Sequence, residues 1–291
     1  RRGAVPLCEP VVPYRHHIAR LLRQDQVKAE RFWRATMSGL TTPTVLGEEQ
    51  SAEGLSQSSP CGTATVTLSA ETSAQLRKFA QTQHVTLNTL VQGAWALLLS
   101  RYSRETRVLF GTTVSGRSAD LPGIDRMVGL FINTLPLPVH VSPDAVLSEW
   151  LKALLEQNGE LRQFEQTPLV QIQGWSEVPR GRPLLESLIV FDNHPMDESL
   201  EDTPGLTVQQ VTLRGQTNYP LTLNVLPGTE VTLSLWYHRN RFLDDTALRM
   251  VRQVETLLTA MMESPHARLG LVSLMPPAER AEVVAGWNRT E

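Results

Sequence analysis

Apolar residues recur at helical spacing along several stretches of this chain. From Thr86, a residue type that favours helix N-caps, they stand three or four positions apart, so the pattern predicts a helix with one buried face. The same periodicity predicts a long helix capped by Asp144 and a final helix capped by Asp244 or Asp245. Further helices are expected over residues 25–38, 71–83 and 168–175.

Alternating or continuous β-branched residues predict the strands. Apolar and polar residues alternate over 221–225 and 231–237 on either side of Pro227-Gly228, which is the clearest hairpin pattern in the chain. The run 108–114 is typical of a strand covered on both faces. Other strands are expected over 65–69, up to Val141 after a turn or loop that starts at Met127, over 187–191 and over 206–213.

The order of these elements predicts a mixed α/β fold of the two-layer α+β kind, in which one sheet is covered by amphipathic helices. Strands and helices do not alternate regularly, which argues against a (β/α)8 barrel and against a dinucleotide-binding fold. Residues 1–13 contain three prolines and are expected to form a linker. The tail, 277–291, is expected to form a short helix and a second linker.

Composition narrows the functional classes. The 291 residues carry a formal net charge of −3, with 27 Lys and Arg against 30 Asp and Glu, which argues against nucleic-acid binding. No stretch reaches the ~18 apolar residues of a spanning helix, so no membrane association is expected. Cys8 and Cys61 form neither a CxxC pair nor a Cys/His metal spacing. We therefore expect no disulfide framework, no metal site and a cytoplasmic location.

Motifs for catalysis are incomplete. The chain contains no GxGxxG, no GxxxxGK[ST] and no GxSxG string. His16 and His17 form the one adjacent histidine pair, but no acidic residue follows closely to orient them, so an exposed helix start is expected. His194 follows a predicted strand beside Asp192, where α/β proteins place ligand groups, although a structural or surface role is favoured. No complete catalytic constellation is visible.

Several strings, in chain order, fit one protein family. The most specific is the pair 110–117 (Phe-Gly-Thr-Thr-Val-Ser-Gly-Arg) and 128–136 (Val-Gly-Leu-Phe-Ile-Asn-Thr-Leu-Pro). The others are 14–19 with 30–34 and Gly39, 86–95, 166–169 with 172–175, 184–193, and 275–280 with 287–290. Together these strings cover nearly the whole chain, and they resemble the condensation domains of nonribosomal peptide synthetases.

The resemblance implies a chloramphenicol-acetyltransferase-like fold built as two lobes, with residues 14–274 as the C-terminal lobe and 275–291 as a linker toward an adenylation domain. Family members join a carrier-bound acyl or peptidyl thioester to the amine of a carrier-bound aminoacyl acceptor, in antibiotic or siderophore biosynthesis. The implied partners are the N-terminal lobe, donor and acceptor peptidyl carrier domains and the adenylation domain. The implied cofactor is 4′-phosphopantetheine on the carriers, with none bound directly.

The chain departs from the family at its HHxxxDG motif, which belongs to the N-terminal lobe. Ile18-Ala19-Arg20 follow His16-His17, so we assign no catalytic residue and expect this chain alone to be inactive. The N-terminal lobe is removed, separate or lost. Two alternatives remain: a non-catalytic module that docks a carrier or adenylation domain, and a coenzyme-A-dependent acyltransferase, which the adenylation-like linker disfavours. An epimerase-type relative is also open, although the string 130–134 resembles the condensing type.

Four residues are candidates for the substrate tunnel or the carrier arm. Arg117 follows Gly116 and precedes a Gly/Pro loop, so it is expected to clamp a loop or to meet a phosphate, with an exposed or structural ion pair as an equal alternative. Asn133 stands at a strand entry, where it would bind backbone or line the tunnel. Ser187 and Asn193 bracket a strand whose end would face the cleft, and they would hydrogen-bond substrate or the amide-forming intermediate. For Asn133, Ser187 and Asn193 a purely structural role is the stronger expectation.

Overall fold

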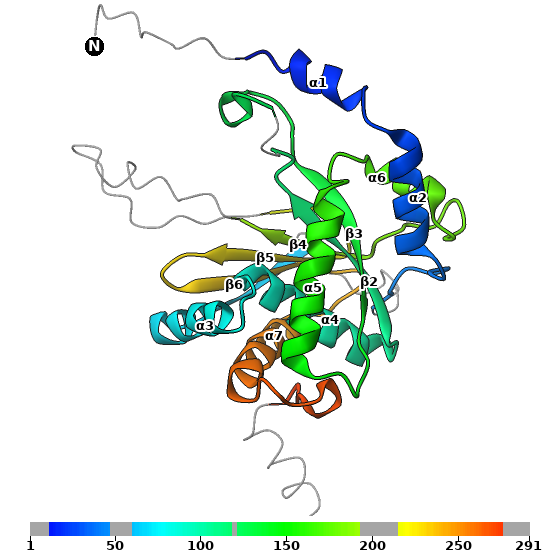
Figure 1. Cartoon of the computed structure of the whole chain (residues 1–291). Coiled ribbons are helices and arrows are strands. Elements are labelled where there is room, and N and C mark those ends of the chain that lie inside the picture. The colour runs from blue at the N-terminus through cyan, green and yellow to red at the C-terminus, as the bar shows by residue number, and fades with distance from the viewer. Residues whose placement is uncertain (1–11, 47–59, 118–120, 193–214, 276–291) are drawn as a thin grey trace, which may run out of the picture.

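The computed structural model describes residues 12–46, 60–117, 121–192 and 215–275, and these residues form a mixed sheet packed against helices (Figure 1). The sheet has six strands in the order β1-β6-β5-β4-β2-β3. β4 runs parallel to β2 and to β5, and the other pairs are antiparallel. The strands are β1 (Cys61–Thr67), β2 (Arg107–Val114), β3 (Asn133–His140), β4 (Ser187–Phe191), β5 (Leu221–Pro227) and β6 (Val231–His238).

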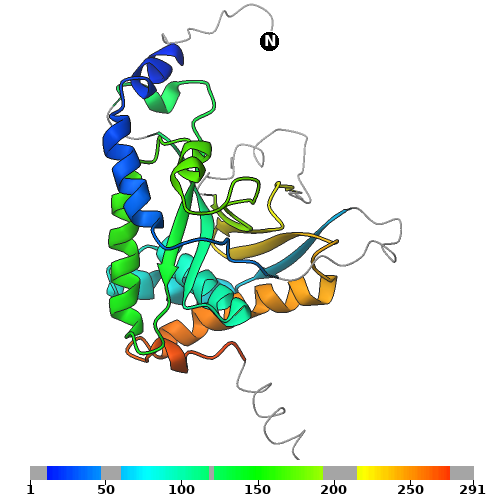
Figure 2. The same ribbon diagram turned by 90° about the vertical axis from the view of Figure 1, so that its right-hand side faces the viewer.

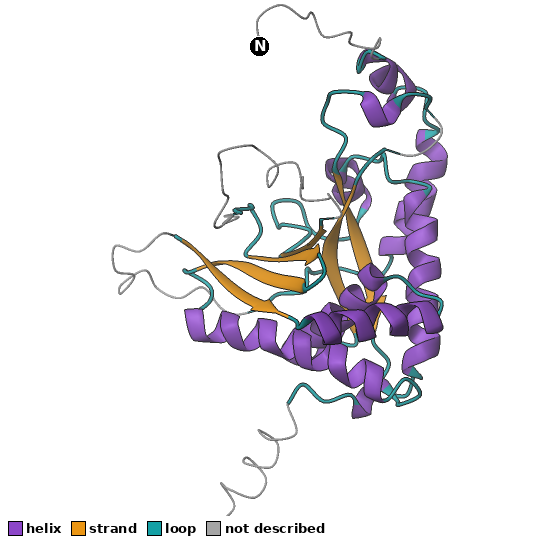
Figure 3. Ribbon diagram, turned by 90° about the vertical axis from the view of Figure 1, so that its left-hand side faces the viewer, coloured by secondary structure: helices purple, strands orange, loops and turns teal. Residues whose placement is uncertain are grey.

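The helices gather along the sheet as two arms of an L (Figures 2 and 3). They are α1 (Arg15–Leu21), α2 (Gln26–Met37), α3 (Ala70–Thr82), α4 (Leu87–Ser103), α5 (Leu147–Arg162), α6 (Leu169–Trp175) and α7 (Asp244–Glu263). Two short 3-10 turns, η1 (Ile124–Arg126) and η3 (Leu269–Leu271), complete the described elements. This arrangement confirms the predicted mixed α/β fold, and the predicted strand 206–213 and tail helix lie outside the described residues.

Of the three predicted helix caps, the one at Thr86 is confirmed and the other two are wrong. The side chains of Asp25 and Thr86 accept hydrogen bonds from backbone N–H groups three residues on, as N-cap residues do. Asp144 does not cap α5, which begins after Val146, because its carboxylate instead binds Arg268 at 3.0 Å.

Neither candidate cap of α7 caps that helix. Asp244 and Asp245 lie within its first turn, and the N-cap residue is Leu243. The hydroxyl of Tyr237 donates to the Asp244 carboxylate at 2.7 Å, and Arg239 Nε donates to it at 3.0 Å. The carboxylates therefore stabilise α7 as negative charge in its first turn rather than as caps.

Helix α4 is buried on all sides, not on one face as its pattern predicted. Every residue from position 89 to position 99 is buried. The helix contacts β2, α3, α5 and α7, so no side of this stretch faces water. Gln92 is the polar exception that the pattern could not explain, and its amide is hydrogen-bonded inside the core.

The outer edge of β3 is closed against further strands. Pro136 and Pro138, two residues apart on this edge strand, have no N–H to donate to an incoming strand. Side chains of α5 bind outward carbonyls: Trp150 Nε1 donates to His140 O at 2.8 Å and Gln157 Nε2 to Pro138 O at 2.7 Å. The sheet therefore cannot grow at β3.

Candidate functional site

A cavity of about 1020 Å³ lies where the parallel strands β2, β4 and β5 end and where α4 begins. Crevices at the carboxyl ends of parallel strands are common ligand sites in α/β folds. Its apolar lining includes Leu87, Val114, Leu130, Phe131, Ile132, Leu135, Leu161, Val190 and Phe191. Its polar lining includes Asn88, Thr112, Ser115, Arg117, Asn158, Arg162, Glu165 and Asp192.

One wall of the cavity exposes apolar side chains to solvent. In the segment 127–132, Met127 and Phe131 are buried, whereas Val128, Leu130 and Ile132 are 86%, 77% and 62% exposed. Leu130 and Ile132 also line the cavity. Contiguous exposed apolar side chains beside a hollow mark a surface that another surface covers. The cavity is thus open to solvent on the side of this segment.

Arg117 holds this wall in place. Its guanidinium donates hydrogen bonds to the carbonyl oxygens of Ile124 and, at 3.1 Å, of Met127. The same group lies 4.1 Å from the centre of the Phe131 ring, a cation–π distance. Arg117 also lines the cavity, so it clamps the loop that carries the exposed wall. Contact with a phosphate stays a prediction.

His17 packs behind the same wall, and the prediction of an exposed histidine pair is wrong for it. His16 is exposed, but His17 is only 2% exposed. The His17 ring centre lies 4.6 Å from that of Phe131 and 5.4 Å from that of Tyr14. Burial lowers the pKa of His17, and the charges of Arg20 and Arg117 lower it further. A pattern confined to α1 could not show a contact with a loop that lies more than 100 residues away.

Asn133 does not line the cavity but supports a loop that does. Its Nδ2 donates to the carbonyl oxygens of Glu165 and Thr167, both at 2.8 Å, and its Oδ1 accepts from Thr134 N at 2.9 Å. Gln166 Nε2 fixes the same loop by donating to Gly116 O at 2.8 Å. The side-chain amide of Asn133 therefore binds backbone groups, which is one of its two predicted roles.

Glu165 is a cavity residue that the sequence pattern did not reveal. Its side chain is buried and lines the cavity. Burial raises its pKa, and nearby Arg162, Gln166 and Arg20 oppose that rise. The one signal in the sequence was a charged residue just before the string 166–169, but spacing alone could not show that the end of α5 turns this residue inward.

Ser187 is not brought to the cavity. It lies at the start of β4, opposite the end that meets the cavity, and its Oγ accepts a hydrogen bond from Trp95 Nε1 at 3.4 Å. Asn193 lies outside the described residues. Asp192, its neighbour, lines the cavity, so the end of β4 does reach the site. A substrate role for Ser187 or Asn193 stays a prediction.

A pair of side-chain amides supports the polar side of the cavity. Asn158 Nδ2 donates to Gln92 Oε1 at 2.8 Å, and Gln92 Nε2 donates to Asn158 Oδ1 and to Thr112 Oγ1, both at 3.2 Å. Gln92 is fully buried, while Asn158 and Thr112 line the cavity. The pair thus fixes polar groups at a wall made by two helices and a strand.

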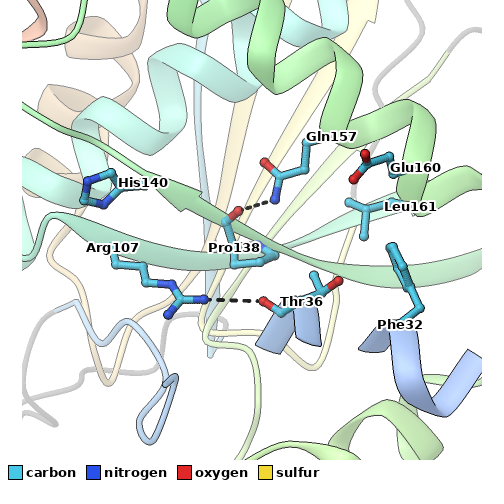
Figure 4. Close-up of a pocket in the computed structure, with 8 residues that line it drawn as sticks. All are labelled: Phe32, Thr36, Arg107, Pro138, His140, Gln157, Glu160 and Leu161. Carbon is cyan, nitrogen blue, oxygen red and sulfur yellow. Dashed lines mark hydrogen bonds between the residues drawn. The ribbon is translucent and has the colours of Figure 1, made fainter. Parts of the chain in front are cut away.

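A second hollow of about 530 Å³ lies between α2, β3 and α5 (Figure 4). Two of its polar side chains, those of Arg107 and Gln157, bind backbone carbonyl groups of the protein. Arg107 donates to the carbonyl oxygens of Ser38 and Thr36 at 2.6 and 3.4 Å, and Gln157 donates to that of Pro138 at 2.7 Å. These contacts join neighbouring elements of the fold, so we interpret this hollow as a groove between packed elements.

Metal centres and membrane spans are both missing from the part of the chain that the structure describes. Within it, no group of three or more His, Cys, Asp and Glu side chains is placed to hold a metal ion. None of the described helices is long and apolar enough to cross a membrane.

Sequence comparison identifies the relatives of this chain. Residues 2–284 match the condensation domain family. A linear gramicidin synthase protein of Brevibacillus parabrevis is 45% identical over 292 residues, which cover 97% of this chain and 6% of that protein. Chondramide synthase cmdD of Chondromyces crocatus is 41% identical over 279 residues, covering 95% of this chain and 7% of that protein. The chain therefore corresponds to a small part of each relative.

Solved structures agree on the fold. A four-domain nonribosomal peptide synthetase bound to AMP and glycine has a TM-score of 0.73 at 17% identity, covering 89% of this chain and 21% of that chain. The condensation domain of the monacolin K polyketide synthase MokA also has a TM-score of 0.73, at 16% identity, covering 92% and 65%. These likenesses confirm the chloramphenicol-acetyltransferase-like fold. The family match and the sequence relatives show that the chain belongs to the condensation domains of nonribosomal peptide synthetases.

Proposed function

We propose that this chain is the C-terminal lobe of a condensation domain that, in the intact protein, joins a carrier-bound acyl or peptidyl thioester to a carrier-bound aminoacyl acceptor through an amide bond. The observation that carries the proposal is the open cavity whose wall exposes Leu130 and Ile132. A cavity edged by exposed apolar side chains is suited to be closed by a second lobe. The 291 residues contain no HHxxxDG segment, which the N-terminal lobe would supply.

The lining of the cavity fits a carrier-bound substrate. A 4′-phosphopantetheine arm on each carrier domain would present its acyl or aminoacyl group as a thioester. Apolar side chains such as Leu135 and Leu161 would exclude water from the thioester, which protects it from hydrolysis. The polar groups of Thr112 and Asn158 would orient the substrate because the Gln92 amide holds them in place.

The proposed partners follow from the family. They are the N-terminal lobe, donor and acceptor peptidyl carrier domains and an adjacent adenylation domain, which residues 275–291 would approach. The assembly would work in the cytoplasm. A non-catalytic docking module is the second candidate, favoured by one observation: the described residues lack a complete catalytic constellation.

An assay with loaded carriers tests the proposal. Donor and acceptor carrier proteins are incubated with the full-length protein or with this chain alone, and dipeptidyl thioester is measured by mass spectrometry. We expect product with the full-length protein and none with the chain alone. A full-length protein that binds the carriers but forms no product would favour the docking module.

A charge in the exposed wall tests how the cavity is closed. Leu130→Asp in the full-length protein should abolish most of the product because the apolar wall could no longer pack against a second lobe. Val170→Asp, on α6, is the matched control because Val170 is 75% exposed, close to the 77% of Leu130. The control should keep its activity. Equal activity of the two variants would contradict closure through this wall.

A further inference from the structure

The cavity contains a buried carboxylate that the fold positions with several contacts. Glu165 follows the last turn of α5 and is only 8% exposed. Its own backbone carbonyl is held by Asn133, and the next side chain, that of Gln166, is tied to Gly116 O. These bonds come from β3 and from the loop after β2, so both sides of the cavity fix where Glu165 lies.

The protein leaves this carboxylate short of partners. Within the described residues it accepts one hydrogen bond, a long one of 3.5 Å from Gln166 Nε2. The charges of Arg162 and Arg20 favour its ionised form, but burial outweighs them and raises its pKa. An ionised carboxylate has about four acceptor sites, so several of those of Glu165 stay available to a group in the cavity that this residue lines. A ligand that brings N–H donors would satisfy them.

The surroundings of Glu165 indicate the kind of ligand. Leu135, Leu161 and Phe131 line the same cavity and provide apolar surface, and Thr112 and Asn158 provide neutral polar groups. A compact organic group with a nitrogen donor at one end matches this lining. Among the groups that the proposed reaction brings into the cavity, the amine of the aminoacyl acceptor has that form.

We propose that Glu165 is a substrate-binding residue that accepts a hydrogen bond from the amine of the aminoacyl acceptor and so positions its nitrogen. The proposal rests on the amide-forming function proposed above. It assigns recognition of the amine to this lobe, whereas the His-containing motif would act from the other lobe. The side chain of the acceptor plays no part in this contact, so the effect should be the same for different neutral acceptors.

The test is Glu165→Gln in the full-length protein, which keeps the shape of the side chain and removes its charge. With saturating donor carrier, the KM for a carrier loaded with a neutral amino acid should rise about 10- to 100-fold, the usual worth of a hydrogen bond to a charged group. Binding of the same carrier loaded with the deamino acyl group, measured as inhibition, should not change. Glu160→Gln, an exposed position in the last turn of α5, is the matched control and should leave both values unchanged.

Thermal unfolding separates this role from a structural one. Because the pKa of Glu165 is raised above its ordinary value of 4.5, ionisation opposes folding as the pH rises through the folded pKa. Glu165→Gln should therefore be at least as stable as the wild type at pH 7.5, and this advantage should vanish below about pH 4.5. A structural role would predict a lower melting temperature at neutral pH.

The outcomes distinguish a failure of the proposed function from a failure of the role proposed for Glu165. If the wild-type protein formed no dipeptidyl thioester, the proposed function itself would be contradicted. With an active wild type, an unchanged acceptor KM in Glu165→Gln would overturn the role of Glu165. An equal loss of binding for the deamino analogue would also overturn it, because the amine would then not be the partner.

Discussion

The side-chain amides of Gln92 and Asn158 should stabilise the fold because each satisfies hydrogen-bonding groups of the other. Gln92→Leu, which nearly keeps the volume, removes three hydrogen bonds with donor–acceptor distances of 2.8, 3.2 and 3.2 Å. At about 1 kcal/mol each, the gross loss is about 3 kcal/mol. Part of it is regained, because leucine suits the buried position and because Asn158 and Thr112 line the cavity, where water can reach them.

The net loss should be about 2 kcal/mol, which corresponds to a fall in melting temperature of about 4–8 °C for a domain of this size class. Asn158→Leu should cost at least as much, because it leaves the fully buried Gln92 amide with Thr112 as its one remaining partner. The double variant should lose less than the two single variants added together, since replacing both members leaves no orphaned amide. We expect a coupling energy of about 1–2 kcal/mol.

Denaturant unfolding of the four proteins of this double-mutant cycle measures the coupling. Gln157→Leu is the matched control, because Gln157 lies on α5 next to Asn158. Its amide binds the carbonyl oxygen of Pro138 in an open groove, where water can take the place of that amide. Its loss should stay below about 0.5 kcal/mol. Additive losses in the cycle, or a control as damaging as Gln92→Leu, would refute the reasoning.

Three further predictions concern the wall of the cavity. The pKa of His17 is lowered from 6.5, so His17 supports stability fully above about pH 6.5 and less as the pH falls; His17→Gln should make the melting temperature less sensitive between pH 7.5 and 5, and an unchanged slope would contradict this. Gly129→Ala should detach α1, because a Cβ there would overlap the Tyr14 ring, and limited proteolysis near α1 should accelerate; an unchanged rate would contradict this. Arg117→Lys should lose the two-carbonyl clamp while keeping the charge, so acceptor and donor KM values should both rise; unchanged values would show that the charge suffices.

The sequence predicted the elements whose signal is local. The helix α2, the strand β4 and the hairpin of β5 and β6 follow directly from periodicity, and the Thr86 cap follows from residue type. The cap at Asp144 failed because an aspartate near a helix start has competing partners, here Arg268. Local patterns thus located the helices better than they identified which polar group satisfies each end.

The site was less predictable because its residues meet through tertiary contacts. For Arg117 the sequence left a loop clamp, a phosphate contact and an ion pair open, because the two carbonyl groups that it binds lie in the next loop. Ser187 lies at the start of β4, away from the end that meets the cavity, because the sequence pattern gives the strand but not which of its ends faces the cavity. The one local signal of Glu165, a charge just before the string 166–169, could not show its burial, because Asn133 and Gln166 fix the loop through tertiary contacts.

The backbone of the wall, residues 127–132, is held by several contacts although its apolar side chains stay exposed. Gly116 adopts a positive φ of 64°, and a Cβ at this position would overlap the backbone of Phe131, so glycine is required there. The hydroxyl of Tyr14 binds Leu130 O, and Arg117 binds Met127 O. These contacts fix the backbone of the wall at Met127 and Leu130, yet the side chain of Leu130 is 77% exposed. Contacts that fix an apolar side chain in water do not stabilise the fold by burial, and this supports the proposal that another surface closes the cavity.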